Sequence, residues 1–449
     1  MAAAAVLPPE VLFAWAGEVA GGRVVETRQV TGGNRYCSWA IDVETADGCR
    51  LPLYLRYQMP RPPSAEPYTV AREAEIYRAI SGSPVKAPRL IAVHPGRHAI
   101  LTERAPGRAD FRRLADPAHR VTVVQEFIAA LAELHRLDIA RMGLEGFDPA
   151  ATIADHVGRE IAIWRAMYAE TGRSDPLVDL ALAWLDRQLP RPDARPVLVH
   201  GDAGPGNFLF DAGHMTALLD WELAHLGDPM EDLAWFSMRC AMEPVPGFAD
   251  RIAEYEQLMG RAIDRTRILY HRVLVSTRVV IIRHRNVTGE PGNSIVSRAL
   301  NRRLLIDALA AATGVPLPAP APIDAVPTAR TSLYDGVIED LRREMAERSS
   351  DPTIVASAKN AAKVLKYLRA CDHLGPAIET ADMAALTTAL GHRPQSVAQG
   401  EATLVQGVMD DSYAIAAVLP TFAGIAQRAA QLAAASSGGI AGRTFPELP

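Results

Sequence analysis

The chain lacks the features of a disulfide-rich, zinc-binding or membrane-spanning protein. Its 449 residues include only four cysteines, which lie far apart, and no CxxC motif or Cys/His cluster occurs. Neither a disulfide framework nor a zinc site is therefore expected, and reduced thiols are typical of a cytoplasmic protein. No uninterrupted apolar run reaches the roughly 18 residues that a transmembrane helix needs.

The chain also lacks an excess of basic residues. Its 47 lysines and arginines are outnumbered by 52 aspartates and glutamates, which gives a formal net charge of −5. Binding to nucleic acid without sequence preference requires a basic surface, so neither nucleic acid nor a membrane is expected as a partner. The GxSxG and Walker A motifs are absent too, which disfavours a hydrolase and a P-loop enzyme.

Strand-like runs separated by turn signals dominate the first hundred residues, and helical periodicity dominates the rest. Helices are expected over residues 68–80 and 121–137. Further helical stretches are expected at about 150–170, 176–188, 230–242, 248–285 and 294–313, with one β segment at 197–219 between them. Five prolines between Gly314 and Pro327 indicate a stiff linker before an alanine-rich helical segment.

We therefore predict four parts: a nucleotide-covering N-lobe (1–104), a C-lobe with the catalytic loop and acceptor site (105–313), a linker (314–330) and a helical accessory domain (331–449). The apolar helical faces of the last part suit packing onto the catalytic part or onto a second subunit. A homodimer is one expectation that follows from this.

One stretch carries residues suited to phosphoryl transfer. Asp202 and Asn207 lie at the two ends of an Ala-Gly-Pro-Gly loop, and Asp220 lies where the return strand of a predicted hairpin ends. Such a hairpin brings Asn207 and Asp220 close enough to share one divalent cation. Phosphoryl transfer needs a carboxylate that orients and deprotonates the attacking hydroxyl, and oxygen ligands that hold Mg²⁺ against the phosphates.

The wording HGDxxxxN followed by LLDWE resembles the aminoglycoside phosphotransferase/choline kinase branch of the protein-kinase-like superfamily. The continuation AHLGDPMEDLA (224–234) is similar to bacterial phosphotransferase-family proteins and to kinase-like domains attached to some acyl-CoA dehydrogenases. The resemblance covers about residues 20–310. It implies an α+β, bilobal protein-kinase-like fold with a small β-rich N-lobe and a large helical C-lobe, to which this chain adds a C-terminal all-helical domain.

The resemblance also implies a role for each residue of the motif. It makes Asp202 the catalytic base, and Asn207 and Asp220 the metal ligands. It makes His200 a structural histidine behind the loop, and Asp232 the buried aspartate that braces the loop from the next helix. A simple turn-forming role for the three motif residues fits their combined spacing poorly.

Several N-lobe residues are assigned by the same resemblance. Gly32, Gly33 and Asn34 resemble the phosphate-covering turn, although an ordinary hairpin turn is the alternative. Arg56 occupies the place of the usual phosphate-binding lysine, and its alternative is a plain edge-strand arginine. Glu73 resembles its helix partner, with a solvated charge as the alternative reading and Glu75 as the alternative partner.

The segment from Thr102 to Gly107, which includes Glu103 and Ala105, resembles the hinge whose backbone would hold a nucleobase. With the other assignments it implies ATP or GTP as phosphate donor and Mg²⁺ as cofactor.

The acceptor is the least determined part of the prediction. Ten arginines lie between residues 261 and 303, opposed only by Asp264 and Glu290. An arginine-rich wall would repel a polycationic aminoglycoside and attract a carboxylate or phosphate. This favours an anionic acceptor such as a hydroxy acid or hydroxyacyl-CoA. The alternative is that the arginines form a solvated helix face or pair with acids of the C-terminal segment.

We therefore expect a magnesium-dependent phosphotransferase that moves the γ-phosphate of ATP or GTP to a hydroxyl of a small molecule. Two alternatives stay open. One is a nucleotide-binding pseudokinase or scaffold, which the arginine at position 56 favours. The other is a kinase of an aminoglycoside or amino alcohol.

Overall fold

The computed structural model describes residues 9–30, 36–58, 64–96, 98–144, 147–148, 151–285, 291–319 and 321–449. Gly32, Gly33 and Asn34, the predicted phosphate-covering residues, lie outside these ranges. The chain divides into two compact units. The first comprises Met1–Glu170, Pro190–Ile268 and Pro446–Pro449, and the second comprises Thr171–Leu189 and Leu269–Phe445.

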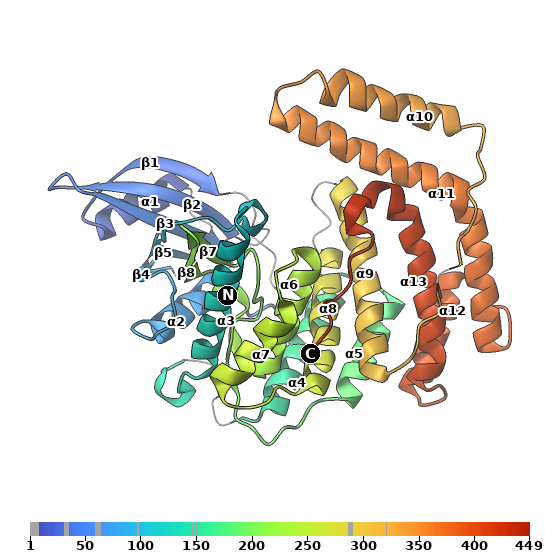
Figure 1. The fold of residues 1–449 in the computed structure, drawn as a ribbon, viewed down its shortest axis with the longest axis horizontal. Helices are drawn as coiled ribbons and strands as arrows, with labels where there is room; N and C mark the ends of the chain where they lie inside the picture. Colours follow the sequence, from blue (N-terminus) through green and yellow to red (C-terminus); the bar gives the residue numbers. More distant parts are fainter. Residues whose placement is uncertain are drawn as a thin grey trace. The chain divides into compact units, whose positions relative to one another are not determined.

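The first unit begins with a helix, α1 (Pro9–Val19), and an antiparallel sheet of five strands (Figure 1). The strands follow one another across the sheet in the order β1-β2-β3-β5-β4. Their bounds are β1 Gly22–Val30, β2 Tyr36–Thr45, β3 Arg50–Gln58, β4 Leu90–Val93 and β5 Ala99–Glu103. Each pair of neighbouring strands is antiparallel.

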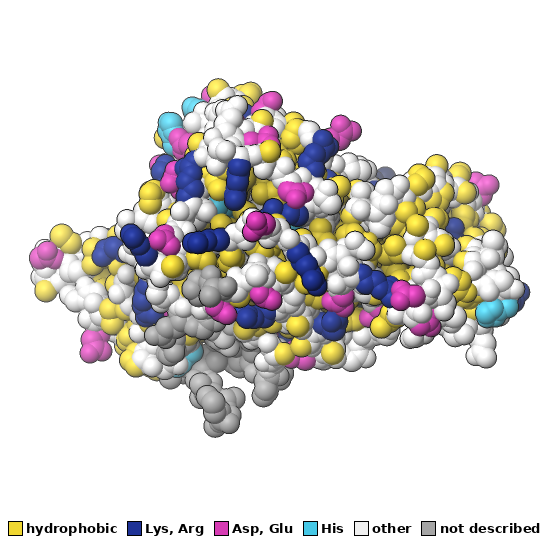
Figure 2. All heavy atoms as spheres, turned by 90° about the horizontal axis from the view of Figure 1, so that it is seen from below, with side chains coloured by type: hydrophobic (Ala, Val, Ile, Leu, Met, Phe, Trp, Pro, Cys, Tyr) yellow, Lys and Arg dark blue, Asp and Glu magenta, His cyan; other side chains and the backbone are white. Residues whose placement is uncertain are grey.

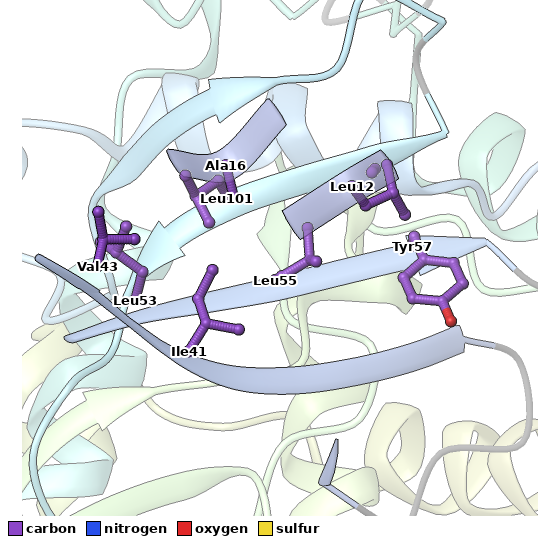
Figure 3. Close-up of a cluster of buried hydrophobic side chains, with 9 residues drawn as sticks. Leu12, Ala16, Ile41, Val43, Leu53, Leu55, Tyr57 and Leu101 are labelled. Carbon is purple, nitrogen blue, oxygen red and sulfur yellow. The ribbon is translucent and has the colours of Figure 1, made fainter. Parts of the chain in front are cut away.

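Helix α1 covers one face of this sheet and closes its hydrophobic core (Figure 3). Leu12 and Ala16 of α1 lie against Ile41 of β2 and Leu55 of β3, and all four are fully buried. Alternate residues of a strand point to the same face, which is why positions 41 and 43 and positions 53, 55 and 57 enter one cluster. This core fixes the position of β3, the strand that carries Arg56.

Helix α2 (Val70–Ile80) follows the first three strands. The side chain of Thr69 caps it by accepting a hydrogen bond from the backbone N–H of Arg72. The apolar residues Ala74, Ile76 and Tyr77 are buried, and so is the acidic Glu73 on the same helix. A buried carboxylate requires a partner, and the site described below supplies it.

The remainder of the first unit is mainly helical, with two short antiparallel strand pairs between the helices. Its helices are α3 (Pro117–His135), α4 (Ile153–Ala169), α6 (Pro229–Met242) and α7 (Phe248–Met259). Strand β6 (Val197–Val199) pairs with β9 (His225–Gly227), and β7 (Phe208–Asp211) pairs with β8 (His214–Leu218). These pairs frame the segment that carries Asp202, Asn207 and Asp220.

The second unit is built from helices. They are α5 (Pro176–Arg187), most of α8 (Arg265–Arg285), α9 (Pro291–Thr313), α10 (Thr331–Asp340), α11 (Pro352–Leu390), α12 (Val397–Met409) and α13 (Ile415–Ser437). Helix α13 packs against both α9 and α11 (Figure 1). The proline-rich segment before α10 forms neither helix nor strand where it is described, and its carbonyls at Pro318 and Ala321 accept hydrogen bonds from two glutamines of α13.

Residues 248–285, which the sequence predicts to be helical, contain two helices with a break between them. Gly260 adopts a left-handed conformation with φ of 63° and ends α7. Asp264 then accepts a hydrogen bond from the backbone N–H of Arg267 in the first turn of α8. Within the described residues, no helix combines the length and the apolar character that a bilayer crossing needs.

Candidate active site

Strand β6 leads directly into the loop that carries Asp202 and Asn207. Gly201 has a φ of 79°, and a Cβ at this position would lie 2.2 Å from the carbonyl oxygen of Leu223. Gly204 has a φ of 142°, and a Cβ there would lie 2.6 Å from the Cβ of Arg239. Both glycines are thus required by close approach as well as by backbone conformation.

Asp232 braces this loop from helix α6, in the position that the sequence assigns to it. Its carboxylate accepts hydrogen bonds from the backbone N–H groups of His200, at 2.7 Å, and Gly201, at 2.9 Å. The ring of His135 lies 3.0 Å from the same carboxylate. All these groups are buried, so water cannot hydrogen-bond to them and they satisfy one another instead. His200 itself contacts the carbonyl oxygen of Leu219 through Nε2, at 2.8 Å.

Asp202 is held by an arginine of helix α6. Nε of Arg239 donates to Oδ1 of Asp202 at 2.8 Å, and Nη2 donates to the other carboxylate oxygen. Such a two-point contact fixes the plane of the carboxylate. On the other side, Nδ2 of Asn207 donates to the backbone carbonyl of Asp202 at 2.8 Å. The candidate base and the candidate metal ligand are therefore joined in one loop.

The β7–β8 hairpin brings Asp220 next to this loop. The backbone N–H of Leu219 donates to the carbonyl oxygen of Asn207 at 2.8 Å, which closes the hairpin at the point the spacing predicts. Asp220 itself adopts a left-handed conformation with φ of 67° and ψ of 58°. This conformation is uncommon for a residue other than glycine, and it costs of order 1–3 kcal/mol. A strained acidic residue at a loop end is typical of a functional position.

Arg56 on β3 joins three carboxylates. Its guanidinium lies 3.2 Å from Glu73 of α2, 2.9 Å from Asp220 and 2.8 Å from Glu222. The ring of Tyr36 stacks against it at 4.5 Å. The guanidinium of Arg56 on β3 thus links helix α2 to the segment after β8.

The three carboxylates are not equivalent, because one guanidinium cannot neutralise all of them. Burial raises the pKa of Glu73 to about 7, against the opposing effect of Arg56. Burial would also raise the pKa of Asp220, but the attraction of Arg56 outweighs it and holds that pKa below its ordinary value. Burial disfavours the charge of Arg56, but its three acidic partners outweigh this effect and raise its pKa. The cluster therefore keeps Asp220 ionised and places the shared proton on Glu73.

The donor atoms at Asn207 and Asp220 are suited to magnesium. They are an amide oxygen and a carboxylate oxygen, which are the hard ligands that this ion prefers. Within the described ranges, no group of three or more His, Cys, Asp or Glu side chains could hold a metal ion without help. Mg²⁺ commonly uses one or two protein ligands and completes its octahedron with water and phosphate oxygens, so the residues fit an ion that enters with a nucleotide.

Other predicted residues are not linked to this cluster by a described contact. Glu103 ends β5 and lies 3.6 Å from Arg89, and Ala105 follows in the next segment; both are half-buried. Two residues of the cluster, Arg239 and Glu222, were not predicted. Arg239 lies seven residues after Asp232, which is two turns along one face of α6, so both residues can face the loop.

The fold resembles that of a solved structure from the aminoglycoside phosphotransferases. A solved structure from Ralstonia eutropha, assigned to the aminoglycoside phosphotransferases, superposes with a TM-score of 0.54 and 22% identity. The superposition covers 68% of this chain and 98% of the Ralstonia eutropha chain. The predicted α+β fold, with a small β-rich N-terminal part, a helical body and an additional helical C-terminal region, is confirmed.

The family model described as "Phosphotransferase enzyme family" matches residues 42–269, about half of the chain, and the chain belongs to this family. Among curated proteins, acyl-CoA dehydrogenase family member 11 of Rattus norvegicus is 32% identical over 183 residues, which cover 38% of this chain and 23% of that protein. Member 10 of Mus musculus is 30% identical over 185 residues, which cover 38% and 17%. The chain spans less than a quarter of the length of these relatives.

Proposed function

We propose that the chain is a magnesium-dependent kinase that transfers the γ-phosphoryl group of ATP or GTP to a hydroxyl of a small molecule. The observation that carries the proposal is the connected set of side chains around the catalytic loop. Asn207 and Arg239 hold Asp202, and Arg56 joins Asp220 to Glu73. Membership of the phosphotransferase family supports the same reaction class.

In this proposal each residue has one task. Asp202 orients the acceptor hydroxyl and takes its proton as the phosphoryl group transfers. Asn207 and Asp220 hold Mg²⁺, which neutralises charge on the phosphates. Arg56 exchanges its contact with Asp220 for phosphate oxygens, which a guanidinium can grip with two parallel hydrogen bonds. Glu73 keeps Arg56 oriented during that exchange.

For the acceptor we propose an anionic hydroxylated molecule, such as a hydroxy acid or a hydroxyacyl-CoA. One observation supports this class. The curated relatives that match this chain carry acyl-CoA dehydrogenase names, so a thioester of coenzyme A is a reasonable first acceptor to test.

A screen for nucleotide consumption tests both parts of the proposal. The full chain with Mg²⁺ and either ATP or GTP is offered hydroxy acids, their CoA esters, choline and kanamycin, and release of ADP or GDP is measured. We expect turnover with at least one anionic acceptor. Turnover with choline or kanamycin alone would contradict the acceptor class but leave the kinase proposal intact.

A nucleotide-binding scaffold is the second candidate, and the Arg56–Asp220 ion pair is the observation that favours it. This pair occupies a carboxylate that a kinase needs for its metal. If the pair persists with nucleotide present, the chain binds nucleotide without turnover. Calorimetry with MgATP, with and without candidate acceptors, separates the two candidates, because only a kinase produces ADP at a rate that depends on acceptor concentration.

A further inference from the structure

The arginine-rich stretch over residues 261–303 is not one uniform basic surface. Arg267 is paired with Asp228, and Arg302 is paired with Asp175. Arg265 and Arg303 donate to backbone carbonyls near the end of the chain, and Arg272 stacks on Phe445. On the face shown in Figure 2, basic and acidic side chains are likewise interspersed. At least five of the ten arginines in this stretch are therefore used within the protein.

Arg283 of α8 and Arg298 of α9 differ from these arginines. Both line a small cavity of about 50 Å³ within the second unit. Across the described residues, no carboxylate pairs with either guanidinium. Both side chains are half-buried, and Nε of Arg283 is buried without a hydrogen-bond partner. Burial and the neighbouring charge of Arg298 lower the pKa of Arg283. Two like charges are thus held together at a cost, as in a site that awaits an anion.

A third donor lines the same cavity. Asn301 is only 3% exposed, and its Nδ2 group has no hydrogen-bond partner in the structure. It lies three residues after Arg298, one turn along the same face of α9. A buried amide N–H₂ group without an acceptor costs about 1–3 kcal/mol, so its presence needs an explanation.

The acidic residue of the cavity is already neutralised. Asp175 caps α5 by accepting from the backbone N–H of Leu177, and it also accepts from Arg302 and contacts Nε2 of His284 at 2.8 Å. Three arginines and one aspartate leave the cavity with a formal charge of +2 when His284 is neutral. A compact dianion would balance this charge.

We propose that Arg283, Arg298 and Asn301 form an oxyanion site for inorganic phosphate or the phosphate end of a monoester. The two guanidiniums supply paired N–H donors, and the amide of Asn301 supplies a further one. This site does not depend on the kinase reaction proposed for the first unit, because no residue of the catalytic loop takes part in it.

Binding of phosphate to the full chain tests this proposal. Inorganic phosphate, glycerol phosphate and acetate are titrated at constant ionic strength, and the dissociation constant is measured by calorimetry. We expect saturable binding of phosphate, with at least about tenfold weakening in Arg298→Gln and loss in the double variant Arg283→Gln/Arg298→Gln. Arg261→Gln is the matched control, because Arg261 is an exposed arginine of the same stretch, and we expect it to bind phosphate normally.

The thermal midpoint without phosphate separates a binding site from a structural one. Arg283→Gln should unfold at the same temperature as the wild type or higher, since it removes a desolvated like charge. Equal binding by the double variant, equal loss in Arg261→Gln, or acetate binding as tightly as phosphate would each overturn the proposal. If glycerol phosphate binds as well as inorganic phosphate, the site accepts an ester; if it does not bind, the site takes the free ion. MgATP binding should be unchanged in all variants.

Discussion

The two units treat their arginines in opposite ways. Around the catalytic loop, Arg56 and Arg239 contact Glu73, Asp202, Asp220 and Glu222, so two guanidiniums face four carboxylates. The formal charge is −2 when all four carboxylates are ionised and −1 when Glu73 holds a proton. The cavity of the second unit carries +2. The first arrangement suits a divalent cation and the second an oxyanion. The comparison shows that arginine content alone does not predict a ligand: the local balance with carboxylates does.

Removing the candidate base, Asp202, should have the largest effect, and the quantity affected is turnover. Asp202→Asn keeps the shape of the side chain but cannot take a proton from the acceptor. General-base action is typically worth about 10²–10⁴-fold, so turnover should fall by that factor. Nucleotide affinity, measured by calorimetry in the same variant, should be retained. Turnover equal to that of the wild type would rule out the assignment of Asp202.

Removing Asp220 is expected to abolish the metal dependence of nucleotide binding. In the wild type, EDTA should weaken ATP binding, because Asn207 and Asp220 no longer have an ion to share. In Asp220→Ala, ATP should bind weakly whether or not Mg²⁺ is present. The matched control is Glu222→Gln, which also removes a partner of Arg56 but no proposed metal ligand. A normal response to Mg²⁺ in Asp220→Ala would contradict the assignment.

The motif residues were predictable because their relations are local in sequence. Asn207 and Asp220 flank one hairpin, and a single backbone hydrogen bond from Leu219 to Asn207 closes it. Arg239 was not predicted, because its contact with Asp202 depends on how α6 packs against the loop. The break between α7 and α8 was missed although Gly260 and Asp264 are ordinary end and start signals.

The N-lobe assignments depended on tertiary contacts that no sequence pattern contains. Glu73 and Glu75 were both candidates for the partner of Arg56, and only the packing of α2 against the sheet selects Glu73. Likewise, the ten arginines between residues 261 and 303 look alike in the sequence. Their division into paired and unpaired members appears only when Asp175, which precedes them by many residues, is placed beside Arg302.

The shared proton of the Arg56 cluster predicts a pH dependence of stability. The pKa of Glu73 is about 7 in the folded chain against 4.5 as its ordinary value. Between these two pH values, Glu73 still holds its proton in the folded state but has lost it in the unfolded state. This difference stabilises the folded state fully below about pH 4.5, and the stabilisation disappears as the pH rises through 7. The wild type should lose about 3 kcal/mol relative to Glu73→Gln over that range. Urea unfolding at several pH values measures this difference, and parallel stability profiles would contradict it.

The smallest predicted effect is on stability, and it comes from a substitution that gives the basic cavity a carboxylate, as in the first unit. Asn301→Asp places a carboxylate of nearly the same shape beside Arg298 and Arg283, which gives these arginines the partner they lack. Because the new charge is paired when it is buried, we expect the free energy of unfolding to rise by about 1 kcal/mol or to stay unchanged. Phosphate binding should be lost, since one donor becomes an acceptor and the cavity charge falls. Asn293→Asp, an exposed asparagine of the same helix, is the control and should leave phosphate binding unchanged. A marked loss of stability in Asn301→Asp, with phosphate binding retained, would show that Arg283 and Arg298 are already compensated and would remove the contrast between the two units.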